Sequence, residues 1–145
     1  MSNTGSLERF TQSTRDVVER AKASARRYKH THITPEHLLL GMIEIKDVQI
    51  LKCLKAAKAT PEQIVLLVQH HLRPGNVELA EAELSFSERA KRVLESAKAE
   101  CLRAQKKQIA PEHLLIGLAQ VHNTVAGAVL AAVDLNPDVL RKQFE

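Results

Sequence analysis

Residues 33–41 of the chain read ITPEHLLLG, and residues 109–117, which follow 76 positions later, read IAPEHLLIG. Sliding the whole chain by the same 76 positions aligns it with itself without a gap, from Phe10 on Phe86 to Val68 on Phe144. One offset kept over this length indicates a tandem duplication of a single unit. Further matching pairs are Val17 with Val93, Ala21 with Ala97, Leu54 with Leu130 and Pro61 with Pro137.

The composition favours helices as the building blocks of the unit. Of the 145 residues, 44% are hydrophobic but only 3% are aromatic. Alanine and leucine dominate, whereas a β-sandwich would need β-branched and aromatic residues. We therefore expect an all-α fold.

Four helices are predicted in each unit. The first has an apolar stripe at helical spacing, at positions 10, 17, 18, 21, 25 and 28, and the second unit repeats it at 86, 93, 94, 97, 101 and 104. Thr34 is a good N-cap and Pro35 suits the first helical position, so a second, short helix starts there. Its apolar residues, 38–43, lie on nearly all sides, which predicts a central helix. A third helix has Val48, Leu51 and Leu54, and a fourth starts at Thr60-Pro61 with Ile64, Leu67 and Val68 inward.

The second unit repeats these helix starts at Ala110-Pro111 and Asn136-Pro137. Ala110 is a poorer cap than Thr34 by about 1 kcal/mol. Four such helices bury too little surface to be stable alone. We therefore expect one domain over residues 1–145: repeat one (8–72), a linker (73–84) and repeat two (85–145). Its eight helices should pack with pseudo-twofold symmetry.

Charge and cysteine usage limit the classes of function. The net charge of +4 comes from 21 basic and 17 acidic residues, which are interspersed, and aromatic rings for stacking bases are nearly absent. This argues against nucleic acid as a partner. No apolar run approaches the roughly 18 residues of a membrane span, and no signal peptide opens the chain. Cys53 and Cys101 lack CxxC partners and match apolar positions of the other unit, so we expect buried thiols in a cytoplasmic protein.

The duplicated motif resembles the N-terminal domain of the Clp/Hsp100 unfoldases, with ClpC or ClpA as the most similar type. Its features are Phe10-Thr11 and Phe86-Ser87 before a long helix, each followed by Pro-Glu-His-Leu-Leu. The resemblance covers residues 8–145. It implies a module that recruits protein substrates or adaptor proteins to a Clp ATPase and its protease core. No G-x-x-x-x-G-K-[ST] phosphate loop is present, so we expect no enzymatic activity in this chain.

An alternative is a stand-alone accessory subunit, similar to the plant ClpT type, that binds and regulates the Clp protease core. The corresponding location would be the plastid stroma if the source is a plant. A bound cofactor is not expected under either interpretation.

The resemblance also implies ligand-binding residues. In ClpC-type domains, the glutamates matching Glu36 and Glu112 grip the guanidinium of phosphoarginine on marked substrates. Thr11 or Ser87, at the start of a long helix, would offer a hydroxyl and backbone N–H groups to the phosphate. The alternative for either glutamate is a plain first-turn acid that interacts with the helix dipole. We expect two unequal sites, with Glu36 the better one.

A second candidate surface lies where the two long helices start. The resemblance implies a groove there for peptides or adaptors, lined by Leu7, Phe10, Arg15, Phe86 and Lys91. Arg15 and Lys91 are repeat equivalents. Phe86 fits the core equally well, and Leu7 stands where the family has an aromatic residue.

Histidines are the remaining candidates. No carboxylate or cysteine cluster accompanies the pairs at 30/32 and 70/71, so we expect surface histidines and no metal site. His37 and His113 occupy the same position just inside a helix start. Neither has a partner that spacing would identify as catalytic, so we expect a structural hydrogen bond from each.

Overall fold

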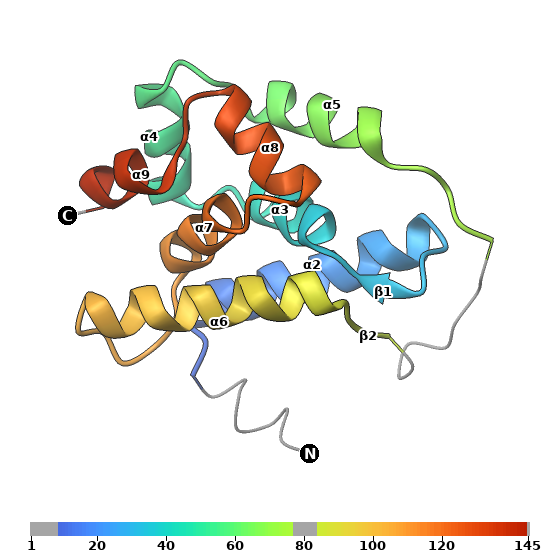
Figure 1. The fold of residues 1–145 in the computed structure, drawn as a ribbon, viewed down its shortest axis with the longest axis horizontal. Helices are drawn as coiled ribbons and strands as arrows, with labels where there is room; N and C mark the ends of the chain where they lie inside the picture. The colour runs from blue at the N-terminus through green and yellow to red at the C-terminus, as the bar shows by residue number, and fades with distance from the viewer. Residues whose placement is uncertain (1–8, 77–83, 145) are drawn as a thin grey trace.

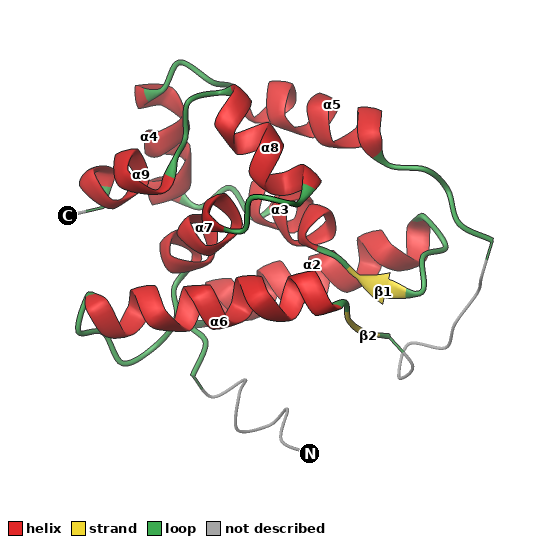
Figure 2. Ribbon diagram, in the orientation of Figure 1, coloured by secondary structure: helices red, strands yellow, loops and turns green. Residues whose placement is uncertain are grey.

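The computed structural model describes residues 9–76 and 84–144, and these contain eight helices (Figures 1 and 2). The fold is all-α, as the composition and periodicity predicted. The helices are α2 (Gln12–Arg27), α3 (Pro35–Glu44), α4 (Val48–Ala56), α5 (Pro61–His71), α6 (Glu88–Arg103), α7 (Pro111–Gln120), α8 (Val125–Ala132) and α9 (Pro137–Gln143). Two strands of two residues each, β1 (His32–Ile33) and β2 (Ser85–Phe86), were not predicted.

The duplication is visible in the helix boundaries. The long helices α2 and α6 both have 16 residues, the short helices α3 and α7 both have 10, and the members of each pair start 76 positions apart. Both short helices are buried on nearly every side and contact each other, and each also contacts the long helix of the other repeat. They form the centre of one pseudo-twofold bundle.

Crossed backbone pairing joins the two repeats. Strand β1 runs parallel to β2, with Ile33 opposite Phe86, and an equivalent parallel bridge joins Phe10 to Ile109. The N–H of Ser87 donates to the carbonyl of Ile33 at 2.9 Å, and the N–H of Thr11 donates to that of Ile109 at 3.0 Å. Each long helix is therefore positioned at its start by the other repeat.

The core agrees with the predicted stripes in most positions. Cys53 and Cys101 are buried free thiols, as expected. One position of the predicted stripes is wrong, since Ala104 is exposed. On α4, Val48 is 63% exposed. Ile50, 1% exposed, packs in the core on α4 instead. No single helix of the described ranges is long and apolar enough to cross a membrane; α7 and α8 pass that test only together, and they meet at 97°.

Two glycines let the long and short helices of each repeat approach closely. A Cβ at Gly41 would lie 2.6 Å from the carbonyl oxygen of Val17, and one at Gly117 would lie 2.7 Å from that of Val93. Both neighbours are backbone atoms, so no side chain can move aside. The glycine that closes the repeated motif is required by helix packing.

Replacing Gly117 with alanine should therefore destabilise the domain, although alanine favours helices by about 1 kcal/mol. Overpacking against a backbone costs more than this gain, so we expect the free energy of unfolding to fall by about 1–2 kcal/mol. Urea denaturation measures the change. Ala99→Gly on the exposed face of α6 isolates the propensity effect. A Gly117→Ala variant more stable than the parent chain would contradict the packing argument.

Histidines cap the two central helices. The N–H of Thr34 donates to Nδ1 of His37, and the N–H of Ala110 donates to Nδ1 of His113, both at 2.9 Å. The predicted structural role of these histidines is confirmed. The expected difference between Thr34 and Ala110 as caps is wrong, because neither side chain makes a cap hydrogen bond to its helix. The hydroxyl of Thr34 contacts His37 Nδ1 at 3.0 Å instead.

In repeat one the capping histidine begins a relay. Because Nδ1 of His37 accepts a hydrogen bond, its proton is on Nε2, which donates to Nδ1 of His30 at 2.9 Å. Nε2 of His30 then donates to the carbonyl of Arg73. The N–H of Gly75 donates to the carbonyl of Tyr28 at 2.7 Å. Residues at the start of the predicted linker are thus held against repeat one, while 77–83 lie outside the described residues.

The relay predicts a loss of stability in acid. Burial, followed by the nearby His30, lowers the pKa of His37 from 6.5 to about 4. The folded state therefore binds fewer protons than the unfolded chain between these values, and stability is complete above pH 6.5 and lost as the pH falls to 4. A shift of this size corresponds to about 3 kcal/mol.

The matched variant is His37→Gln, because Gln63 caps α5 with the same geometry, accepting from the N–H of Thr60. Urea denaturation between pH 7 and 4 should show a flatter pH dependence in this variant. An unchanged slope would assign the acid sensitivity to another group.

Candidate functional site

Glu36 lies in the first turn of α3, at the edge of a pocket of about 410 Å³. Three helix starts converge on this pocket, those of α3, α6 and α8. Its lining residues are Thr34, Pro35, Glu36, Ser87, Glu88, Arg89, Asn123, Thr124 and Val125. Carboxylates, hydroxyls and the N-termini of three helices therefore share one space.

The pocket combines residues of both repeats. Glu36 comes from repeat one and Ser87 from repeat two, because the β1–β2 pairing places the start of α6 beside the segment that leads into α3. Ser87 is the N-cap of α6, and its Oγ accepts from the N–H of Ala90 at 3.1 Å. The sequence left open whether Glu36 would act with Thr11 or with Ser87, and in the structure Ser87 lines the same pocket as Glu36.

Glu36 also interacts with a helix start, but not that of its own helix. Its Oε2 accepts from the N–H of Ala126 in the first turn of α8 at 3.3 Å. Thr124, the N-cap of α8, accepts from the N–H of Gly127 in the same turn at 2.9 Å. This contact of Glu36 with α8 was not predicted from the sequence. Among the described residues, this is the one hydrogen bond of the Glu36 carboxylate, and it involves one of its two oxygens.

Charges around this pocket have both signs. Arg89 adds a cation to its lining, and Glu88 adds a second carboxylate. Glu88 is exposed and its carboxylate is 3.3 Å from Nζ of Lys91. The ion pair offsets part of the repulsion that Glu88 would exert on an anion at the start of α6.

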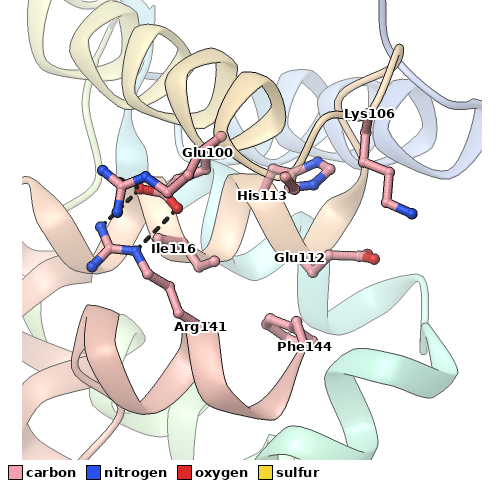
Figure 3. A pocket seen from close by; sticks show the side chains of 9 residues that line it. Glu100, Lys106, Glu112, His113, Ile116, Arg141 and Phe144 are labelled. Atoms are coloured by element: carbon pink, nitrogen blue, oxygen red, sulfur yellow. Dashed lines mark hydrogen bonds and ion pairs between the residues drawn. The ribbon is translucent and has the colours of Figure 1, made fainter.

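Glu112 occupies a different setting. It lines a second pocket, of about 420 Å³, between the C-terminal ends of α6 and α9 and the start of α7 (Figure 3). Thr11 is not among the lining residues; it caps α2, where its Oγ1 accepts from the N–H of Thr14 at 3.2 Å. Glu36 and Ser87 thus line one pocket, whereas the pocket that Glu112 lines here is formed by other described residues.

A buried ion pair in this second pocket was missed. Glu100 is 4% exposed and accepts from Nη2 of Arg141 at 2.8 Å and from Nε at 3.1 Å. This bidentate bond holds the pKa of Glu100 below its usual range. Glu100 corresponds to Ser24 in repeat one, so the repeat comparison offered no sign of it.

The predicted peptide groove is only partly described. Phe10 is 5% exposed and belongs to the core, and Phe86 is half-buried against it. Arg15 is half-buried on α2, while Lys91 is exposed on α6. Leu7 lies outside the described residues, so the groove stays a prediction.

Comparison with known proteins identifies the family. A family model for the Clp repeat (R) N-terminal domain matches residues 9–143. The ATP-binding subunit ClpC of the ATP-dependent Clp protease from Staphylococcus saprophyticus is 31% identical over 135 residues, which is 93% of this chain and 16% of that protein. The chloroplastic chaperone protein ClpC2 of Oryza sativa is 34% identical over 137 residues, 94% of this chain and 15% of that protein. This chain spans about one sixth of the length of these relatives.

Solved structures show the same fold. The N-terminal domain of ClpD from Arabidopsis thaliana superposes with a TM-score of 0.72 at 28% identity, covering 94% of this chain and 95% of that one. The N-domain of ClpV from Vibrio cholerae gives a TM-score of 0.83 at 14% identity, covering 99% and 87%; at this identity the likeness shows the fold alone. On the match of the family model and the identity to ClpC, this chain belongs to the Clp repeat N-terminal domain family.

Proposed function

We propose that this domain recruits protein substrates or adaptor proteins to a Clp ATPase and that the pocket at Glu36 binds the phosphoarginine side chain of marked substrates. The observation that supports this function best is the convergence of Glu36, Ser87 and the start of α6 on one pocket. This arrangement offers a group for each half of a ligand that combines a guanidinium with a phosphate.

The guanidinium half would bind Glu36. A carboxylate forms strong, charge-assisted hydrogen bonds to guanidinium N–H groups. Only one oxygen of Glu36 is engaged in the bond to Ala126, so the carboxylate would be held in place by α8 while it binds the ligand. That bond orients the side chain toward the pocket at little entropic cost.

The phosphate half would bind the start of α6. The first N–H groups of a helix have no partner within it, and the helix dipole favours an anion there. Ser87 adds a hydroxyl and Arg89 adds a cation that lines the same pocket. Glu88 opposes this attraction, but its ion pair with Lys91 reduces the effect.

Glu112 and Thr11 would form the weaker, second site. They are the repeat equivalents of Glu36 and Ser87, each 76 positions from its counterpart. The first turn of α2 has no acidic residue, which suits an anion. However, Glu112 lines a pocket that lacks Thr11. We therefore expect the Glu36 pocket to bind first.

Calorimetric titration with free phosphoarginine tests this proposal, with unmodified arginine as the ligand control. Glu36→Gln keeps an oxygen that can accept from Ala126 but removes the charge, so binding should weaken by about tenfold or more. Glu36→Ala combined with Glu112→Ala should abolish it. The control Glu62→Gln changes an exposed first-turn acid of α5 that is outside the pocket. Absent binding, or an affinity that the double variant leaves unchanged, would disprove the site assignment.

A further inference from the structure

An apolar groove lies in repeat one between the end of α3 and the helices α4 and α5. Its volume is about 650 Å³, and each of the three helices contributes to its apolar lining, through Ile43, Leu51, Val65 and Leu66. None of its lining residues lines the Glu36 pocket, so the groove is independent of phosphoarginine binding there. The proposed function leaves this groove without a role.

Large apolar side chains are exposed beside the groove. In the described part of the chain three such side chains are exposed, and two of them are Val48 on α4 and Leu66 on α5, at 63% and 66%. Val48 lies three residues before Leu51 and therefore on the same face of α4. Repeat two has Thr124 and Lys142 at the positions equivalent to Val48 and Leu66, and both are polar. The fold does not require apolar residues there, and an exposed apolar surface around a groove is typical of an interaction site.

One difference between the repeats changes how the short helices pack beside the groove. In repeat two, Gly127 lets α8 lie against the end of α7, because a Cβ there would be only 2.6 Å from the carbonyl oxygen of Val121. Leu51 occupies the equivalent position on α4, and α4 packs less closely on α3 than α8 packs on α7. Because a leucine cannot approach a backbone as closely as a glycine, its side chain is left to line the groove.

The charges at the groove give it a surface that can match itself. Lys46 and Glu62 both line the groove, and within the described residues neither side chain forms an ion pair or a hydrogen bond. The third charged lining residue, Glu44, is partly neutralised by Nη1 of Arg20 at 3.4 Å. One cation and one carboxylate are thus left beside an exposed leucine and an apolar groove. An interface with twofold symmetry uses the same surface on both subunits, so that surface must be complementary to itself.

We propose that this groove is the contact surface between two copies of the chain, related by a twofold axis. Leu66 of each copy packs into the groove of the other, and Lys46 of one copy pairs with Glu62 of the other. The axis repeats each contact, so both charges are paired in both copies. A second copy is the expected occupant because the same surface supplies the apolar side chain, the groove and both charges. One groove and one inserted side chain per copy make a small interface, so we expect a weak dimer with a dissociation constant in the micromolar range.

Sedimentation equilibrium of the purified chain at micromolar to millimolar concentrations tests the proposal. The parent chain should dimerise. Leu66→Lys, which introduces the residue of repeat two, should raise the dissociation constant at least about hundredfold, because two leucines per dimer lose their burial. The matched control is Leu102→Lys, since Leu102 is also 66% exposed but lies on α6, on the opposite side of the bundle from α4 and α5 (Figure 1). This control should dimerise as the parent chain does, and circular dichroism verifies that both variants are folded.

A charge exchange distinguishes self-association from the binding of any other partner. Lys46→Glu brings carboxylates of the two copies together, and Glu62→Lys brings cations together. Each variant alone should dimerise at least about tenfold more weakly than the parent chain. An equimolar mixture should dimerise as the parent chain does, because every charged contact between unlike variants joins a lysine to a glutamate. Lys98→Glu mixed with Glu95→Lys, both at exposed positions of α6, should dimerise no differently from either variant alone.

A parent chain that stays monomeric at millimolar concentration would overturn the inference and would leave the groove to a different protein. A dimer that Leu66→Lys does not weaken would overturn it too. The same holds if the mixture of Lys46→Glu and Glu62→Lys dimerises no more tightly than the separate variants. Phosphoarginine binding by the Leu66→Lys variant should match that of the parent chain, so failure of either proposal is recognised separately.

Discussion

The crossed backbone pairing between the repeats is the interaction on which the rest of the structure depends. The N–H of Ser87 donates to Ile33, and that of Thr11 donates to Ile109, so each long helix begins at a point that the other repeat defines. Because a helix start is where an anion binds best, this pairing also decides which glutamate meets which helix. The Glu36 pocket is therefore a property of the assembled pair of repeats, and neither repeat alone would form it.

The repeated motif serves packing more than binding. In residues 111–117, Pro111 starts the helix, His113 caps it and Gly117 allows α6 to approach. The leucines between them are buried in the core. Of the polar residues, only Glu112 is left half-buried and facing a pocket. The motif thus holds one glutamate per repeat in a rigid helix turn, and rigidity of this kind reduces the entropic cost of gripping a ligand.

Much of the fold followed from the sequence because the offset of 76 and the helical stripes extend over many residues. The features that the sequence analysis missed are very short elements or contacts between distant residues. Neither kind produces a periodic pattern in the sequence. Strands of two residues have no alternation, so the β1–β2 pairing had no signal, and without it the partner of Glu36 stayed open. A structural hydrogen bond was expected for His37, but its partner, the N–H of Thr34, which donates to Nδ1, was not, because histidine is not a usual cap. The pair of Glu100 and Arg141 joins helices 41 residues apart without any motif.

The duplication gives the two repeats equivalent side-chain positions. The residues that differ between the repeats determine which contacts each position makes. Positions 30 and 106 share backbone geometry, yet His30 bonds to His37 in repeat one, whereas Lys106 lines a pocket in repeat two. The same divergence affects the glutamates. Asp47 caps both Gln49 and Ile50 at the start of α4, whereas α8 leaves the N–H of Ala126 for Glu36 to accept. The two repeats therefore share a symmetric backbone but have two different pockets. The chemistry of each pocket follows from the residues that differ between the repeats.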